Sequence, residues 1–213
     1  MSTDPLQFLN ETAPALFAKG IEALEAKAAE GNDRATKTLA SIRSVTGAAY
    51  VVVDGAGAVY LSHQDGVVTA GESAPDGVPI KFAVGFPADA AEMVLGEAAD
   101  EGAMDDPRVA MGVAQIPNPD LDEMLAGRTL TCHVVIEDVP DLGNVTVRVG
   151  LNVPEPPADP GFKATLKFDD LEDLRDGEIN PQQLFMGGKL RMEGDYSVAL
   201  QLAMGLAAKA QQR

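Results

Sequence analysis

The fold is decided by residues 162–195, which read FKATLKFDDLEDLRDGEINPQQLFMGGKLRMEGD. The first residues of this stretch alternate as in a strand, and the acidic, leucine-containing residues after them predict a helix over Asp169–Asp176. Asn180 can cap a further helix with Pro181 at its first position, where the missing N–H has no helical partner to lose. A short strand is expected over Lys189–Glu193. The stretch therefore predicts a unit that mixes helices and strands.

A closing helix is expected from a cap at Asp195 to about Lys209. Apolar side chains occupy nearly the whole circumference of its first three turns, so we expect this helix to be buried on more than one face. In the strand before it, Leu190 and Met192 point to the same face, because side chains alternate along a strand.

Two helices open the chain. Thr12 is the expected N-cap of the first helix, which ends at Gly31, and Asn32 or Asp33 caps the second helix, which runs to Gly47. Alternating or valine-rich segments then predict strands, namely Ala48–Asp54, Val59–His63, Gly66–Ala70, Pro79–Phe86, Thr129–Glu137, Asn144–Asn152 and Phe162–Phe168. Short helices are expected over Asp89–Glu97 and Asp120–Ala126, and an extended piece over Val109–Ile116.

The second half restarts the order of elements seen in the first half. The strand Ile80–Phe86 can be aligned with Phe162–Phe168, and a hairpin precedes each of them. The helix after each strand ends alike, in Leu95-Gly-Glu97 and in Asp176-Gly-Glu178. The pattern indicates either an internally repeated hairpin-strand-helix unit or a chance similarity of a common order.

The ordered motifs of the C-terminal stretch resemble one known family. They are a strand, an acidic and leucine-containing helix, the Asn180-Pro-Gln182 turn, an apolar turn with Phe185 and Gly188-Lys-Leu190 before a strand ending in Gly194-Asp195. This set resembles the sterol carrier protein 2 (nonspecific lipid-transfer protein) family, with its best match over Gly161–Ala210. The resemblance implies an α+β fold in which a mainly antiparallel sheet is covered by helices. It also implies a hydrophobic tunnel that the last helix closes.

Three segments are expected along the chain. They are an N-terminal helical segment over 1–47, a hairpin-strand-helix unit over 48–127 that is a possible degenerate first repeat, and a sterol carrier protein-like unit over 128–213. Only a very short helix precedes the second hairpin, whereas family members place an amphipathic helix there. We therefore expect one composite domain that shares the N-terminal helices.

Composition and charge exclude several classes of protein. The formal net charge of −17 argues against binding to nucleic acid, which depends on Lys and Arg contacts to phosphates, and against adsorption to an anionic membrane. A run of about 18 apolar residues is absent, so no stable membrane insertion is expected. One cysteine and the lack of a basic, then apolar leader predict a cytoplasmic location. The oligomeric state is not determined by the sequence.

Residues with catalytic or metal-binding chemistry are few. His63 and His133 are the only histidines, and His63 is expected on the surface at the end of a strand. Cys132 precedes His133 on a strand, so their side chains should point to opposite faces, and Cys132 is expected to be a small buried side chain. The doublets Asp105-Asp106 and Asp169-Asp170 lack the spacing of a calcium loop. We therefore predict no enzyme activity, no metal and no cofactor.

The resemblance implies a soluble binding or carrier protein for an apolar lipid-like ligand, such as a sterol, fatty acid, acyl-CoA or isoprenoid. The alternatives are a non-catalytic accessory or scaffold subunit of a lipid or quinone biosynthetic assembly, and a filled core that serves only dimerisation. The candidate ligand-binding residues are Phe162, Leu166, Phe168, Leu174, Leu184, Phe185, Met186, Leu190, Met192, Leu200 and Met204. Alternation along the strands prevents all of these side chains from facing one cavity.

Overall fold

The N-terminal helical segment begins earlier than the sequence predicts. In the computed structural model, which describes residues 4–91, 110, 119–125 and 127–210, α1 (Pro5–Gln7), η1 (Phe8–Thr12) and α2 (Ala13–Ala29) follow without a break. The Asp4 carboxylate accepts a hydrogen bond of 2.9 Å from the Leu6 N–H and caps the segment. Thr12 has helical torsion angles and makes no side-chain cap, so the expected N-cap at Thr12 is wrong. A π-helical turn, in which the Ala13 N–H bonds to the Phe8 carbonyl, carries the helix through this position.

The second helix has the predicted cap. The Asn32 side chain accepts a hydrogen bond of 3.0 Å from the Ala35 N–H and begins α3 (Asp33–Arg43). Phe17, Ile21 and Leu24 of α2 form a buried cluster with Leu39 and Ile42 of α3. The cluster joins the two helices into one layer.

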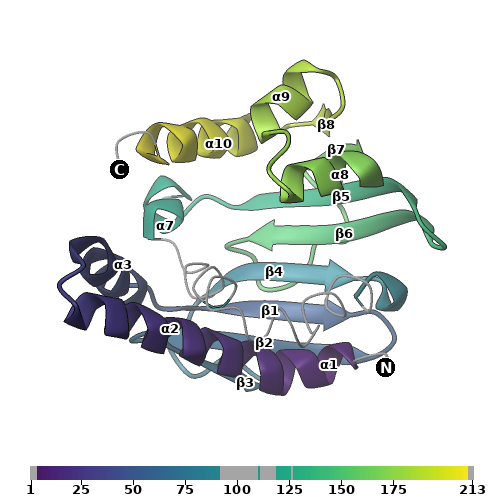
Figure 1. Cartoon of the computed structure of the whole chain (residues 1–213). Coiled ribbons are helices and arrows are strands. Elements are labelled where there is room, and N and C mark those ends of the chain that lie inside the picture. The colour runs from purple at the N-terminus through teal and green to yellow at the C-terminus, as the bar shows by residue number, and fades with distance from the viewer. Residues whose placement is uncertain (1–3, 92–109, 111–118, 126, 211–213) are drawn as a thin grey trace.

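Eight strands form a single sheet in the order β3-β2-β1-β4-β6-β5-β7-β8 (Figure 1). They are β1 (Gly47–Val53), β2 (Gly57–Gln64), β3 (Val67–Gly71), β4 (Ile80–Phe86), β5 (Leu130–Val139), β6 (Gly143–Leu151), β7 (Phe162–Lys167) and β8 (Arg191–Gly194). The remaining helices are α7 (Pro119–Leu125), α8 (Phe168–Arg175), α9 (Pro181–Met186) and α10 (Ser197–Ala210). These elements match most predicted segments within a few residues. Apart from Ala110, the extended piece expected over Val109–Ile116 lies outside the described residues, as does the end of the helix expected over Asp89–Glu97.

The sheet is mixed, which corrects the expected mainly antiparallel sheet. The pairs β1–β4 and β5–β7 run parallel, while the hairpins β1–β2 and β5–β6 run antiparallel. In each case the chain leaves a hairpin, crosses over and returns beside the hairpin's first strand. A crossover connection places the returning strand parallel to its neighbour, whereas a short hairpin makes the neighbours antiparallel.

The two halves of the sheet share one topology. The order β2-β1-β4 in the first half corresponds to β6-β5-β7 in the second half, with a parallel pair at the same place in each. The strands that the sequence aligns are β4 and β7. Strand β4 also pairs antiparallel with β6, with Val84 opposite Val149, and this pairing makes the two halves one continuous sheet. Whether the halves arose by duplication stays a prediction.

One face of the sheet carries the helices. Figure 1 shows α1 and α2 in front of β1–β3 and α8 in front of β5 and β7. Val51, Val59 and Val84 from three strands are buried against Phe8 and Leu9 of the N-terminal helical segment. The space between the sheet and the helices is therefore filled largely by aliphatic side chains.

Candidate apolar ligand site

Strand β7 places apolar side chains on the helix-covered face. Phe162, Ala164 and Leu166 are buried, whereas Lys163 and Lys167, at alternate positions, are exposed. This alternation is the period of two that the sequence indicates. On β8, Met192 lies opposite Ala164 and therefore points to the same face.

Five of the candidate ligand-binding residues pack together here, namely Phe162, Leu166, Phe168, Leu190 and Met192. Leu190 contacts two clusters, one around Cys132 and Phe162 and one around Ile136 and Leu166. The prediction that Leu190 and Met192 share a face is confirmed, since both pack against the cluster around Cys132. These five side chains therefore form a continuous apolar surface over β5, β7 and β8.

Leu174 and Leu184 lie apart from that surface. Leu174 is half-buried on α8, and Leu184 is buried on α9 with 1% of its surface exposed. The backbone carbonyl of Leu184 accepts hydrogen bonds from the N–H groups of Lys189 and Leu190, at 3.0 and 3.1 Å. Leu184 thus anchors α9 to the segment that enters β8.

Four candidate side chains are exposed to solvent. The exposed fractions are 41% for Phe185 and 78% for Met186 on α9, and 42% for Leu200 and 65% for Met204 on α10. The expectation that α10 is buried on more than one face is wrong for this side of the helix. Only Leu202 among the described leucines of α10 is buried, because the sheet and its neighbours cover one face of the helix. We call Phe185, Met186, Leu200 and Met204 the exposed apolar patch.

Local hydrogen bonds hold α9 and its surroundings in place. The Asn180 side chain accepts a hydrogen bond from the Gln183 N–H, and the Gln183 side chain accepts one from the Asn180 N–H, both at 2.9 Å. This capping box confirms and extends the predicted cap at Asn180. The Asp170 carboxylate, 8% exposed, lies 2.6 Å from the Lys189 ammonium and raises the pKa of Lys189 through that hydrogen bond.

Hydrogen bonds fasten helix α10 at its N-terminus and at Gln201. The Asp195 carboxylate accepts hydrogen bonds from the N–H and the hydroxyl of Ser197, which confirms the predicted cap. Arg128 donates hydrogen bonds to the Gln201 side chain at 2.8 Å and to the Met124 carbonyl at 2.6 Å. These bonds link α10 to the end of α7.

Sequence reasoning missed the connection through Arg128. Its position after Gly127 gave one signal, because a cation at the C-terminus of a helix interacts favourably with the helix dipole. Nothing in the sequence indicated Gln201 as its partner, since the two residues are 73 positions apart.

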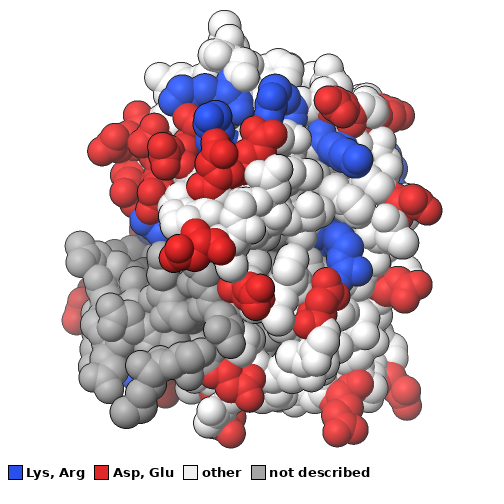
Figure 2. All heavy atoms as spheres, turned by 90° about the vertical axis from the view of Figure 1, so that its right-hand side faces the viewer, with Lys and Arg blue, Asp and Glu red and all other residues white. Residues whose placement is uncertain are grey.

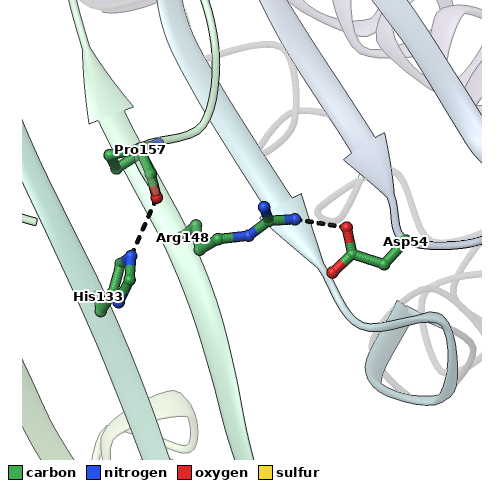
Figure 3. Close-up of polar contacts among 4 residues, drawn as sticks. All are labelled: Asp54, His133, Arg148 and Pro157. Carbon is green, nitrogen blue, oxygen red and sulfur yellow. Dashed lines mark hydrogen bonds and ion pairs between the residues drawn. The ribbon is translucent and has the colours of Figure 1, made fainter. Parts of the chain in front are cut away.

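The sheet carries Cys132 and His133 on opposite faces, as predicted. Cys132 is 4% exposed, and burial raises the pKa of its thiol to about 11, which keeps the thiol protonated and unreactive near neutral pH. On the other face, the His133 Nε2 atom lies 3.0 Å from the Pro157 carbonyl oxygen (Figure 3). Arg148, its cross-strand neighbour, forms an ion pair with Asp54.

His63 is buried, which contradicts the expected surface position. Its exposed fraction is 6%, its Nδ1 atom lies 2.9 Å from the Val45 carbonyl oxygen, and its ring meets the ring of Phe17 edge-on. The end of a strand was expected to reach solvent, but α2 and the link after α3 cover it. Burial lowers the pKa of His63, because a charged imidazolium would lose its hydration.

Several basic side chains of the C-terminal unit are paired with acidic ones. Figure 2 shows Lys and Arg beside Asp and Glu in the upper part of the molecule. The pairs include Arg191 with Glu137 and Lys167 with Asp138, at 2.5 and 3.0 Å. Within the described residues, no three His, Cys, Asp or Glu side chains gather as a metal site would require, and no helix is both long and apolar enough to cross a membrane.

These observations define an α+β protein with one mixed sheet, a helical layer and an aliphatic core on one face. Residues 114–207 match the model of the SCP-2 sterol transfer family. The match covers less than half of the chain and confirms the resemblance inferred from residues 161–210. It begins before β5 and includes all eleven candidate ligand-binding residues.

The solved structures that resemble the chain are distant. The solution structure of the sterol carrier protein domain 2 of Helicoverpa armigera is 23% identical, with a TM-score of 0.32, and the match covers 45% of this chain and 79% of that one. Sterol carrier protein 2 from Yarrowia lipolytica, in its apo form, is 21% identical, with a TM-score of 0.28 and coverages of 40% and 70%. No curated protein matches the chain.

Proposed function

We propose that the protein binds and carries an apolar lipid-like ligand, such as a sterol, fatty acid, acyl-CoA or isoprenoid, in a hydrophobic tunnel of the C-terminal unit. The observation that carries the proposal is the exposed apolar patch on α9 and α10, which lies within the residues that match the SCP-2 sterol transfer family. The ligand would contact the exposed side chains of this patch.

The energetics of such a ligand follow from the burial of apolar surface. Covering an exposed Leu, Met or Phe side chain completely contributes roughly 1.5–3 kcal/mol. Met186 and Met204 are the most exposed members of the patch and therefore have the most surface to lose to a ligand. Their unbranched thioether chains can adapt to ligands of different shapes.

The carrier is proposed to be non-catalytic and cytoplasmic. Two observations on Cys132 support a non-catalytic role, namely its raised pKa and its position on the face opposite to His133. A thiolate–imidazole pair needs contact between the two groups. The single cysteine supports a cytoplasmic location, since a fold without an intramolecular disulfide needs no oxidising compartment.

The proposal is tested by ligand uptake. The purified protein is stripped of lipid by solvent extraction, refolded if needed, and titrated with a fluorescent fatty acid and with a fluorescent sterol. We expect saturable uptake of at least one probe. The substitution Met204→Ser should weaken it by about tenfold, which corresponds to about 1.4 kcal/mol of lost apolar contact.

A matched control is Val67→Ser, which replaces another exposed apolar side chain on β3, at the opposite edge of the sheet from β8. This control should leave uptake unchanged. Stripped protein that keeps its native circular dichroism spectrum but takes up neither probe would refute the carrier. If the same protein instead forms a stoichiometric complex with a biosynthetic subunit, the scaffold alternative is favoured.

A further inference from the structure

Strand β3 is an edge strand whose own sequence carries no charge or proline to oppose pairing, while α2 and η1 pack on one of its faces. It lies at one end of the sheet order, and among the described residues it pairs with β2 and with no other strand. Its residues, Val67-Val-Thr-Ala-Gly71, include no charged side chain and no proline. Edge strands of monomeric proteins are commonly protected by charges, proline, bulges or a covering element, because their free backbone groups can pair with another strand.

The hairpin between β2 and β3 determines which backbone groups are free. Asp65 and Gly66 form a two-residue turn with positive φ angles of 51° and 81°, the geometry of a type I′ hairpin. In such a turn the flanking residues, Gln64 and Val67, are joined by a backbone hydrogen bond.

Hydrogen-bonded and non-hydrogen-bonded pairs alternate along an antiparallel ladder. Counting from the turn, Val67, Thr69 and Gly71 therefore direct their backbone groups toward β2. Val68 and Ala70 direct their N–H and C=O groups toward the free edge. The edge thus presents four backbone groups in a row, two donors and two acceptors.

We propose that a second copy of this chain pairs antiparallel along β3, with a two-fold axis at Thr69. In this register Val68 lies opposite Ala70 of the second copy, and the free groups of both strands complete four hydrogen bonds. Val67, 59% exposed, lies opposite Gly71 of the second copy, which has no side chain to obstruct it. The edge is therefore complementary to itself in both backbone and side chains.

The charge of the chain predicts how this association responds to salt. Each copy carries a formal net charge of −17, so two copies repel each other. Salt screens that repulsion over a distance of about 8–10 Å at physiological ionic strength. The dimer should therefore become more stable as the salt concentration rises.

Sedimentation velocity measures the association directly. We expect the whole chain to form a concentration-dependent dimer in about 0.3 M salt. The dimer should dissociate at low salt. The substitution Ala70→Pro removes an outward N–H and leaves the ladder to β2 intact, because proline is tolerated at an edge position that faces solvent. It should weaken dimerisation at least tenfold while circular dichroism shows a native fold.

Cross-linking tests the register of the proposed β3–β3 pair independently of the Ala70→Pro variant. In the proposed dimer the two Thr69 residues form a non-hydrogen-bonded pair, with Cα atoms about 4.5 Å apart, which suits a disulfide. Thr69→Cys should therefore form a disulfide-linked dimer on mild oxidation. Val67→Cys is the matched control, because its two copies would be offset by four residues, or roughly 14 Å, and should not cross-link.

Two outcomes would overturn the proposal. One is a chain that sediments as a monomer at all concentrations and salt levels, with Thr69→Cys cross-linking no better than Val67→Cys. The other is a Thr69→Cys variant that cross-links only to a different polypeptide in a crude extract. Neither outcome bears on lipid uptake, which depends on the other end of the sheet.

Discussion

Replacing Leu184 by alanine is expected to destabilise the fold by about 3 kcal/mol, within the range of roughly 2–5 kcal/mol for buried leucines. The side chain is only 1% exposed, so the change removes a fully buried isobutyl group and leaves a cavity under α9. In a protein of this size, such a loss lowers the melting temperature by roughly 6–12 °C. The measurement is urea unfolding followed by circular dichroism, with the midpoint and slope fitted separately.

Met186→Ala is the matched control, because Met186 lies two residues further along the same short helix and is 78% exposed. Its free energy of unfolding should change by no more than about 0.5 kcal/mol. Equal losses in the two variants, or a loss below about 1 kcal/mol in Leu184→Ala, would show that the Leu184 side chain is not packed in the core as its burial indicates.

Two further predictions concern buried titratable groups. Burial lowers the pKa of His63 below its ordinary value of 6.5, so the unfolded chain binds more protons, and the free energy of unfolding should fall as the pH drops below about 6.5. His63→Leu should remove this part of the pH dependence in urea titrations between about pH 5 and pH 8. An unchanged dependence of the free energy of unfolding on pH would contradict this prediction. The Cys132 thiol, with a pKa of about 11, should react with iodoacetamide at pH 8 at least tenfold more slowly in the native than in the urea-unfolded chain. Equal rates would argue against its burial.

Local elements followed closely from the sequence. The caps at Asn32, Asn180 and Asp195 and the hairpin over β1 and β2 are where the sequence places them. Each depends on hydrogen bonds between residues a few positions apart, so the residue types and their spacing are sufficient to predict it. The aliphatic alternation of β7 was readable for the same reason.

The errors share a different cause. His63 was expected on the surface, yet α2 and the link after α3 cover it. Leu200 and Met204 were expected inside, yet no described neighbour covers that side of α10. Whether a given apolar or polar face is covered depends on where other elements pack. The sequence of a single segment does not determine those positions.

The pairing of strands was equally inaccessible to local patterns. Arg148 and Asp54, which form an ion pair across the sheet, are 94 residues apart, and β4 pairs with β6 from the other half of the chain. The free edge at β3 follows from the same long-range arrangement.

Residues 162–195 were sufficient to indicate an α+β unit and its resemblance to the SCP-2 sterol transfer family, because their caps, turns and alternating faces are short-range features that the residue types impose directly. Only the tertiary structure determined the mixed sheet, the burial of His63 and the exposed apolar patch. They arise from contacts between segments distant in sequence, whose partners are selected by the packing of the whole sheet and its helices.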